Sequence, residues 1–410
     1  MLLLAKKRIV DFIDFGFDDD LLDGIDAMGY REPTPVQEQV IPHIIAGRDI
    51  IAAAQTGTGK TAAFLLPVLH RLTMTTHAAH KINALILVPT RELAIQISQI
   101  LEGLSYYTDI SSIAVYGGGS GDSFATEKKA LSSGADIVIC TPGRMISHLN
   151  MGYVKMEALD YLILDEADRM LDMGFYEDIV KIISFMPPKR QNLMFSATMP
   201  AAIRKLANFI LVDPVEINIA ISKPPEQIKQ GSFIVYEAQK IPLIKHVIQE
   251  GSFISVLIFC SSKQSVKQLT SELKRNKLSA GEIHSDLEQE AREQVLIDFK
   301  NKRLSILVAT DILSRGIHID DIDLVINYNV PHDGEDYVHR IGRTARAASK
   351  GTAYTFIDPK EQGKFQKIEK LIGRPIDKLP VPGSFGPTPE IFTGDFRKKK
   401  EKNFKNFKRK

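Results

Sequence analysis

Buried-strand patterns recur along the first half of the chain, each followed by turn residues and a stretch with helical spacing. They lie at residues 49–54, 84–88, 112–116, 137–140, 161–164 and 191–195. The second half repeats the pattern at residues 256–259, 305–308, 324–327 and 353–357. Continuous runs of Val, Ile and Leu are typical of strands covered on both faces, as in a parallel sheet with flanking helices. The pattern therefore predicts an α/β fold.

A polar segment divides the two halves. It holds the pair Pro224-Pro225 and lacks an apolar period, which is typical of a linker. We therefore predict α/β domains at residues 1–217 and 228–378, joined by a linker at 218–227. From Pro380 the chain is rich in Pro and Gly and then basic, which predicts a disordered tail at residues 379–410.

The net charge of the chain hides an uneven distribution. Fifty-two basic and 50 acidic residues give +2, which alone argues against a strong polyanion binder. The last twenty residues, however, hold nine of the basic and two of the acidic residues, whereas residues 11–30 hold seven aspartates and no basic residue. Phe396, Phe404 and Phe407 lie within the basic tail. Charge can follow phosphates and rings can stack on bases, so the tail is predicted to bind nucleic acid. The alternative is a solubilising tail without a specific ligand.

The two cysteines exclude a disulfide framework and a four-thiolate metal site. Cys140 and Cys260 each end an apolar run, so we expect buried thiols in a reducing, cytoplasmic setting. We expect no membrane span, because the chain contains no run of about 18 apolar residues. The apolar start, residues 1–5, is too short for a signal peptide.

A glycine-rich turn follows the first predicted strand, in the sequence Ala-Gln-Thr-Gly-Thr-Gly-Lys-Thr. Glycines let backbone N–H groups wrap closely around a phosphate. The lysine can pair with the outer phosphates and the last threonine can ligate Mg²⁺. The general pattern has a glycine where this chain has Ala54. We predict a nucleotide site formed by Ala54, Gln55, Thr56, Gly57, Thr58, Gly59, Lys60 and Thr61.

Three acidic residues follow the strand predicted at 161–164. They belong to the sequence Asp165-Glu166-Ala167-Asp168. A carboxylate at the end of a buried strand beside a phosphate loop can hold Mg²⁺, the role expected for Asp165. Glu166 is then placed to orient or deprotonate the attacking water. The alternative is an exposed acidic loop.

The sequence Asp165-Glu-Ala-Asp168 resembles the motif that gives the DEAD-box RNA helicases their name. Residues 9–378 resemble this family throughout, with ordered motifs at 29–37, 54–61, 89–94, 117–118, 141–144, 165–168, 196–198, 289–292, 309–316 and 339–346. The resemblance implies two tandem RecA-like domains, ATP and Mg²⁺ as cofactors, and RNA as a partner. The tail and the general layout are most similar to the bacterial RhlE-type branch.

The first motif is predicted to recognise adenine. An amide such as Gln37 can donate and accept together, which matches the amino group and ring nitrogen of adenine. In the family an aromatic residue upstream stacks on the base, and the matching residue is Phe12. This predicts a preference for ATP over GTP. The alternative is that Gln37 only caps a helix and Phe12 belongs to the core.

The remaining motifs carry roles implied mainly by the resemblance. Spacing alone does not establish that these loops bind anything, although helix N-termini, glycines and arginines at one sheet edge suit a phosphate track. The predicted RNA contacts are Pro89, Thr90, Arg91, Gly117, Gly118, Thr141, Pro142, Gly143, Arg144, Arg292 and Thr310. The residues predicted to couple ATP state to unwinding are Ser196, Thr198, Asp311, Gly316, His318, His339 and Arg340.

Arg340, Arg343 and Arg346 are spaced three residues apart, which predicts one face of a helix. Arg343 and Arg346 match the arginine fingers of the family, which stabilise charge on the transferring γ-phosphate after domain closure. The alternative is a solvated basic helix face.

Three departures from the family pattern affect the second domain. His318 stands where the family usually has Asp, Ala345 replaces a Gly, and the usual His-Gly-Asp is His284-Ser285-Asp286. A neutral imidazole is a poorer acceptor than a carboxylate. We therefore expect intact ATP binding with weaker domain closure.

Together these observations predict a monomeric, RNA-stimulated ATPase that locally separates short RNA duplexes. One alternative is an ATP-gated RNA clamp or annealer with little unwinding. A DNA helicase fits the motifs less well. A small-molecule kinase would not need the arginines of a second domain.

Overall fold

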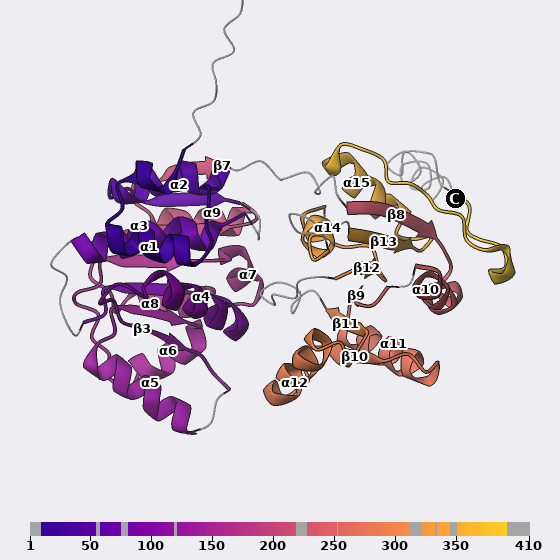
Figure 1. Cartoon of the computed structure of the whole chain (residues 1–410). Helices are drawn as coiled ribbons and strands as arrows, with labels where there is room; N and C mark the ends of the chain where they lie inside the picture. The colour runs from indigo at the N-terminus through magenta and orange to yellow at the C-terminus, as the bar shows by residue number, and fades with distance from the viewer. Residues whose placement is uncertain are drawn as a thin grey trace, which may run out of the picture. The chain divides into compact units, whose positions relative to one another are not determined.

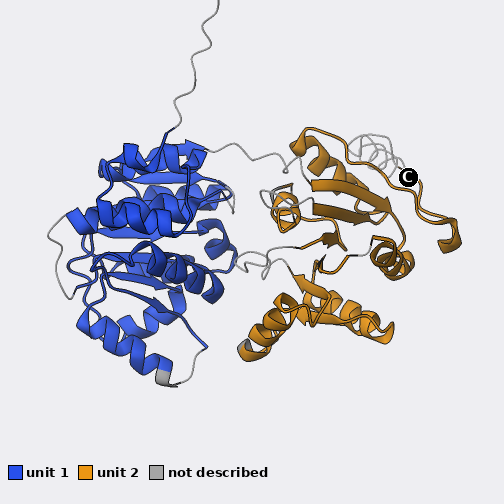
Figure 2. Ribbon diagram, in the orientation of Figure 1, with its two compact units in different colours: residues 1–221 blue, residues 222–410 orange. Residues whose placement is uncertain are grey.

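The computed structural model describes residues 10–54, 58–74, 81–118, 121–218, 228–251, 253–310, 322–332, 334–344 and 351–391. The chain divides into two compact units, residues 1–221 and 222–410 (Figure 2). This division falls inside the predicted linker. Asn218, assigned to the linker from the sequence, is the last residue of a strand of unit one.

Unit one is built on a seven-stranded sheet in the order β3-β4-β2-β5-β6-β1-β7, in which every pairing is parallel. Six of the strands match predicted runs, whereas β7 was not predicted. The strands are β1 (Ile50–Ala53), β2 (Ala84–Leu87), β3 (Ser112–Val115), β4 (Ile137–Cys140), β5 (Tyr161–Leu164), β6 (Gln191–Ser196) and β7 (Val215–Asn218).

Helices cover both faces of this sheet (Figure 1). One face packs against α1 (Asp19–Ala27), α2 (Pro35–Ile45), α3 (Lys60–Met74) and α4 (Arg91–Leu104), with the short helix η1 (Phe12–Phe15) beside them. The other packs against α6 (Pro142–Leu149), α7 (Ala167–Asp172), α8 (Tyr176–Ile183), α9 (Ala201–Ile210) and Leu131 of α5 (Gly121–Ser133).

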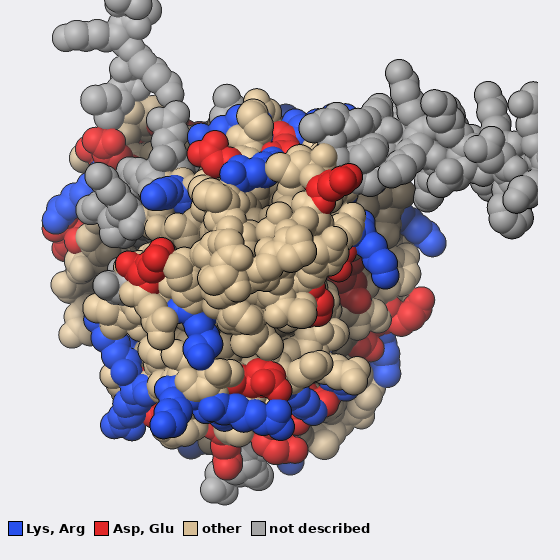
Figure 3. Space-filling model, turned by 90° about the vertical axis from the view of Figure 1, so that its right-hand side faces the viewer, with Lys and Arg blue, Asp and Glu red and all other residues tan. Residues whose placement is uncertain are grey.

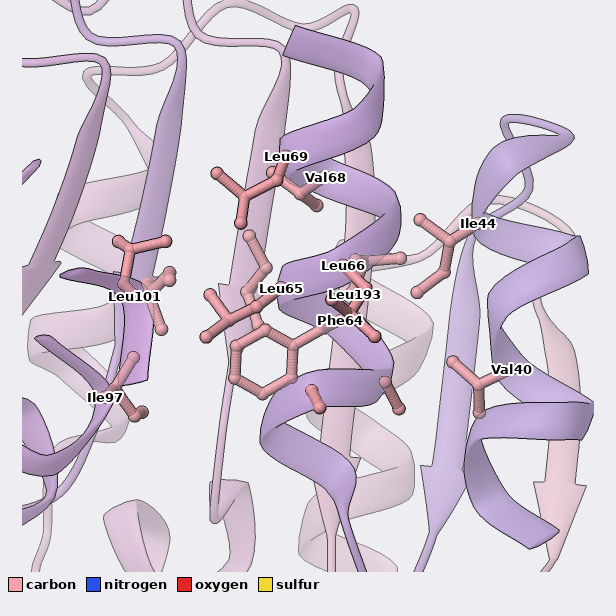
Figure 4. Close-up of a cluster of buried hydrophobic side chains, with 14 of the residues drawn as sticks. Val40, Ile44, Phe64, Leu65, Leu66, Val68, Leu69, Ile97, Leu101 and Leu193 are labelled. Atoms are coloured by element: carbon pink, nitrogen blue, oxygen red, sulfur yellow. The ribbon is translucent and has the colours of Figure 1, made fainter. Parts of the chain in front are cut away.

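The core of unit one alternates along each strand. Ile50 and Ala52 of β1 face the first layer of helices and Ile51 faces the second, as a pleated strand requires. Figure 4 shows α3 between α2 and α4, with Leu65 and Leu69 toward Leu101 of α4. The buried face of α3 is therefore fixed by contacts on both sides, which holds the start of that helix at the sheet edge.

Unit two contains a six-stranded parallel sheet in the order β10-β11-β9-β12-β13-β8. Its strands are β8 (Ile228–Ile234), β9 (Val256–Cys260), β10 (Ala280–Ile283), β11 (Ile306–Thr310), β12 (Leu324–Asn327) and β13 (Gly351–Ile357). One face packs against α14 (Gly334–Ile341), α15 (Gln362–Ile372) and Phe299 of α12 (Gln289–Lys300). The other packs against α10 (Glu237–Gly251) and α11 (Lys263–Arg275). The predicted α/β architecture, a parallel sheet with helices on both faces, is confirmed in both units.

Residues 376–391, which we call the strap, correct the predicted start of the disordered tail. The strap includes the short helix η2 (Gly383–Phe385), and its Leu379, Val381 and Phe385 pack against the core of unit two. Its backbone accepts hydrogen bonds from the side chains of Gln239 and Gln362. The strap could not be predicted from the sequence, because single apolar residues between prolines and glycines show neither a helical nor a strand periodicity. The basic residues and phenylalanines predicted to bind RNA, within residues 392–410, lie outside the described residues.

Both cysteines are free and buried, which confirms the expectation of core thiols. Among the helices that the structure describes, none combines the length and the hydropathy needed to cross a bilayer.

Candidate functional site

The carboxyl ends of the seven strands of unit one meet at one edge of the sheet, because all the strands are parallel. The strand order brings the loops after β1, β6 and β5 together, and these carry the predicted phosphate loop, the predicted coupling residues Ser196 and Thr198, and the acidic motif. The loops after β2, β4 and β3 continue the edge, and these carry the predicted RNA motifs. The two sets of motifs alternate along the sequence. In the sheet they lie apart, in two halves of the same edge.

Lys60 begins α3 and is 5% exposed. Its Nζ has no hydrogen-bond partner among the described residues. A buried ammonium without a partner is unfavourable, and the N-terminus of a helix favours anions. The site therefore fits a phosphate group, with Thr61 beside it. Gln55, Thr56 and Gly57 of the predicted loop lie outside the described residues.

Asp165 follows β5 and is 3% exposed. Burial raises the pKa of its carboxyl to about 6; the nearby Lys60 charge opposes this shift and the Glu166 charge adds to it. Oδ1 accepts a hydrogen bond from the backbone N of Glu166 at 2.9 Å. A buried carboxylate whose charge is only partly compensated suits a divalent cation, and carboxylate and hydroxyl oxygens are ligands of Mg²⁺. Asp165 and Thr61 are the residues that would hold it.

Glu166 adopts a left-handed backbone conformation, with φ 51°. A non-glycine residue pays for this conformation, which is common at functional sites. Its Oε2 accepts a hydrogen bond from Arg169 Nη1 at 3.1 Å, and both side chains are buried. The carboxylate is therefore held at the sheet edge.

Asp168 joins the loops after β5 and β6. Its Oδ2 accepts hydrogen bonds from both the backbone N and Oγ1 of Thr198, each at 3.0 Å. Ser196 Oγ donates to the Thr198 carbonyl at 2.7 Å. The structure thus brings Thr198 into direct contact with the acidic loop, and Ser196 supports Thr198 from the end of β6. Movement of one loop is therefore coupled to movement of the other.

Gln37 makes the helix cap of the alternative interpretation and a second contact to the phosphate loop, whereas its recognition of adenine stays a prediction. Its Oε1 accepts from the Thr34 backbone N at 2.9 Å, which caps α2, and its Nε2 donates to the Gly59 carbonyl at 3.0 Å. A Cβ at Gly59 would lie 2.6 Å from Nε2, and the φ of Gly59 is 91°, so this position requires glycine. The amide keeps one N–H and one lone pair for a further partner.

Phe12 is 3% exposed and lies against the rings of Phe15 and Tyr30, with 6.4 Å between centroids in each case. This is the core position of the alternative interpretation. Stacking of Phe12 on a base remains a prediction.

The loops of the predicted RNA half also contact one another. Thr90 caps α4, and the guanidinium of Arg91 lies 5.0 Å from the ring centroid of Tyr116. Gly118 has φ 85°, and a Cβ there would lie 2.2 Å from Arg91 Nη1. After β4, Thr141 precedes α6, which begins with Pro142 and contains Gly143 and Arg144. The side chain of Arg144 is 16% exposed and pairs with Glu127. Pro89 is buried and Gly117 is half-buried.

In unit two, the two predicted RNA residues lie near the corresponding sheet edge. Thr310 ends β11 and is 8% exposed. Arg292 of α12 donates from Nη2 to the Ser285 carbonyl at 3.0 Å, in the loop after β10. Since β10 and β11 are neighbours in the sheet, these residues belong to adjacent strand ends.

The predicted helix face of three arginines is wrong. α14 ends at Ile341, and Arg340 is 2% exposed. Arg340 Nη1 donates to Asn327 Oδ1 at 3.1 Å and to the Asn329 carbonyl at 3.2 Å, so it ties α14 to the end of β12. His339 is buried, whereas Arg343 lies beyond the helix and is half-buried. Arg346, Asp311, Gly316 and His318 lie outside the described residues.

Sequence reasoning missed several polar residues at these sites. Arg169 could have been found, because it stands three residues after Glu166, a spacing that joins side chains on one helix. Glu127, His148 and Asn327 give no such signal, because their partners depend on which strands are neighbours.

Two family models match the chain. The DEAD/DEAH box helicase model matches residues 34–206, and the model of the helicase conserved C-terminal domain matches residues 239–348. The chain is 38% identical over 392 residues to the ATP-dependent RNA helicase CshA of Listeria monocytogenes, which covers 95% of this chain and 74% of that protein. It is 39% identical over 373 residues to the ATP-dependent RNA helicase DeaD of Mycobacterium tuberculosis, covering 90% and 65%.

Solved structures resemble the whole two-unit chain. Dbp5 of S. cerevisiae bound to RNA and ADP BeF3 has a TM-score of 0.80 and 28% identity, covering 91% of this chain and 96% of that one. Mss116p bound to ssRNA and AMP-PNP has a TM-score of 0.79 and 28% identity, covering 92% and 81%. This chain belongs to the DEAD-box family of RNA helicases.

Proposed function

We propose that this chain couples RNA-stimulated ATP hydrolysis to local separation of short RNA duplexes or to remodelling of RNA–protein complexes. The observation that carries the proposal is the contact of Asp168 with Thr198 beside the buried Lys60 and Asp165. A site that only bound nucleotide would need the buried charges. It would not need hydrogen bonds between the acidic loop and the loop after β6.

The residues around the loops after β1, β5 and β6 have different roles in binding and hydrolysing ATP. Lys60 and the N-terminus of α3 bind the phosphates, and Gln37 and Phe12 recognise adenine. Glu166, held by Arg169, orients the attacking water. When bound, Mg²⁺ supplies positive charge for the phosphates and is held by Asp165 and Thr61. Arg343 and Arg346 of unit two stabilise charge on the γ-phosphate when both ligands are bound.

The other half of the edge binds one RNA strand by its backbone, through the loops after β2, β3 and β4. Contacts to phosphate and 2′-hydroxyl groups explain recognition that ignores base sequence. Similarity to proteins whose structures were solved with RNA supports this assignment. Arg292 and Thr310 add contacts from unit two, and the Asp168–Thr198 link passes the nucleotide state to the RNA side.

The proposal is tested by measuring ATP turnover and strand release with and without RNA, for wild type and Glu166→Gln. We expect RNA to stimulate wild-type turnover. Glu166→Gln should reduce turnover by about 100-fold or more while ATP still binds, because general-base residues contribute on that order. Glu157→Gln, an exposed glutamate of the same unit, is the control.

Other outcomes separate the alternatives. RNA-independent turnover in the wild type contradicts the proposal. RNA binding that depends on ATP but releases no strand favours the clamp, which His318 in place of the usual Asp would suit by weakening closure.

Finer assignments stay predictions. The RhlE-type branch rests on the tail, and the relatives named above carry the names CshA and DeaD. A cytoplasmic location rests on the two buried free thiols, and a monomeric state on the family pattern.

A further inference from the structure

A buried carboxylate lies behind the predicted RNA half of unit one. Glu127 of α5 is 5% exposed. Its Oε2 accepts hydrogen bonds from Arg144 Nε at 2.6 Å and from His148 Nε2 at 2.8 Å, and its Oε1 accepts from the backbone N of Tyr116 at 3.4 Å. A buried charge needs this many partners to be tolerated.

These partners come from two different loops of the sheet edge. Tyr116 follows β3 and immediately precedes Gly117 and Gly118. Arg144 and His148 belong to α6, which follows β4 and begins at the Thr141-Pro142 turn. One carboxylate therefore joins two segments that are predicted to hold RNA.

Aromatic rings complete the arrangement around the two α6 side chains. Phe124, one turn before Glu127, stacks on the ring of His148 with 4.4 Å between centroids, and the Arg144 guanidinium lies 4.5 Å from the same Phe124 ring. His148 is fully buried and its Nδ1 contacts the hydroxyl of Tyr153. If Nε2–H donates to Glu127, Nδ1 accepts from Tyr153, so a neutral imidazole is satisfied on both sides.

The network reaches the third loop as well. The guanidinium of Arg91, at the start of α4 after β2, lies over the ring of Tyr116. The backbone N of that tyrosine donates to Glu127. The ends of β2, β3 and β4 are thus connected through Tyr116 and Glu127.

We propose that Glu127 is a positioning residue for RNA binding, which holds the loops after β3 and β4 in the arrangement that RNA requires. This inference rests on the proposed function, because it takes the RNA half of the edge as given. Glu127 itself is buried and does not touch RNA. It acts through Arg144 and the Gly117–Gly118 segment.

The variant that tests this is Glu127→Gln in the full chain. Glutamine keeps the shape of the side chain but removes the charge, and its amide N–H groups cannot accept from Arg144 or His148. Loss of one charge-assisted bond corresponds to about a tenfold change in affinity. We expect the RNA concentration that half-saturates ATP turnover to rise about tenfold, with ATP affinity measured without RNA unchanged.

Three further variants make the result specific. Glu102→Gln replaces an exposed glutamate of α4, on the other face of the sheet, which accepts from Ser98, and should leave both affinities unchanged. Arg144→Ala should weaken RNA binding, and the double variant Glu127→Gln with Arg144→Ala should be little worse than Arg144→Ala alone, because both changes act on one interaction. Phe124→Leu keeps the hydrogen bonds of Glu127 and should give a smaller loss of RNA affinity. This variant tests the arrangement if Glu127→Gln does not fold.

The outcomes are distinguishable. Unchanged RNA half-saturation in both Glu127→Gln and Phe124→Leu overturns the inference, as does an equal loss of ATP and RNA affinity, which indicates a general structural role. Absence of RNA stimulation in the wild type overturns the proposed function and this inference with it. Normal stimulation in the wild type with no effect of the variants overturns the inference alone.

Discussion

Gln37 takes part in two hydrogen bonds that belong to different tasks. The bond to Thr34 N stabilises the start of α2, and the bond to the Gly59 carbonyl reaches the phosphate loop. The two tasks can be separated, because one uses the amide oxygen and the other the amide nitrogen. A carboxylate keeps the first and loses the second.

Gln37→Glu should bind ATP at least about tenfold more weakly. The free energy of unfolding of unit one should also fall, by about 1–3 kcal/mol, because the buried carboxylate then faces the Gly59 carbonyl. Gln37→Ala should lose ATP affinity and also about 1 kcal/mol of stability, because the cap is removed. Titration with a fluorescent ATP analogue and urea unfolding check the two quantities. If Gln37→Glu binds ATP normally, the residue is only a helix cap.

The buried carboxyl of Asp165 carries a stability penalty at neutral pH. Its pKa is raised from 3.8 to about 6, first by burial. A carboxyl whose folded pKa is raised destabilises the folded state at pH values above that pKa, and the penalty disappears below the unfolded pKa, where the group is protonated in both states. Function explains why the group is kept.

Asp165→Asn should therefore raise the free energy of unfolding of unit one by about 3 kcal/mol at pH 8, the order expected for a shift of about two pKa units. The gain should shrink between pH 6 and 4 and vanish near pH 4. Urea unfolding in nucleotide-free, chelated buffer measures it. Asp160→Asn, an exposed residue at the other end of β5, should show no gain. A pH-independent difference contradicts the burial argument.

Two glycines in the helices of unit one should respond in opposite ways to replacement by alanine. Gly24 of α1 faces α4, and a Cβ there would lie 2.4 Å from the Leu104 carbonyl oxygen. Gly143 of α6 has no heavy atom within 4 Å of such a Cβ. Alanine in a helix is favoured over glycine by about 1 kcal/mol in the absence of contacts.

Gly24→Ala should destabilise unit one by about 1–3 kcal/mol, because backbone atoms of α4 cannot yield as a flexible side chain can. Gly143→Ala should be neutral or slightly stabilising. The thermal midpoint of unit one checks both. Equal effects of the two variants would show that α1 and α4 can move apart freely.

The elements predicted from the sequence and those missed differ in burial. Central strands such as β2 and β5 are buried on both faces and read as continuous apolar runs. The missed strands β7, β8 and β10 lie at sheet edges, where the residues Val-Glu-Ile-Asn or Ala-Gly-Glu-Ile give no such run. Three-residue spacing suggested a helix face for Arg340 and Arg343, but α14 ends between them.

The candidate site shows the same division. Motif residues such as Lys60 and Asp165 were found because a motif is local in sequence. Thr198, which was predicted to couple ATP state to unwinding, is the partner of Asp168. The partners of Glu127 were not predicted, because they depend on β3 lying beside β4.

At the scale of the whole molecule, charge is unevenly divided between the folded units and the tail. On the face that Figure 3 shows, acidic and basic side chains are interspersed around an uncharged centre. The nine basic residues of the last twenty positions all follow Ile391, where the strap ends. The chain can therefore be shortened at two points with different consequences.

Truncation after Ile391 should leave the unfolding midpoint of unit two unchanged. It should flatten the dependence of RNA affinity on salt, because each phosphate contact on a single strand contributes about 0.7 to the slope. Truncation after Lys378 should also lower the unfolding midpoint of unit two, by about 2–4 °C for each kcal/mol of lost strap contacts in a unit of this size. Salt titrations of RNA binding and thermal scans check both. An unchanged salt slope contradicts a role of the tail in RNA binding.

The strap also completes the outer side of β8. Ser232 N donates to the Asp377 carbonyl and Leu379 N donates to the Ser232 carbonyl, each at 2.8 Å, so the strap pairs with the last strand of the sheet. An uncovered edge strand offers a template to strands of other chains. A protease that cut just before the strap would therefore do more than remove the tail that is predicted to bind RNA. It would leave a product prone to pair with copies of itself. The resistance of this helicase to self-association therefore depends on the sixteen residues of the strap, to which we assign no part in ATP or RNA chemistry.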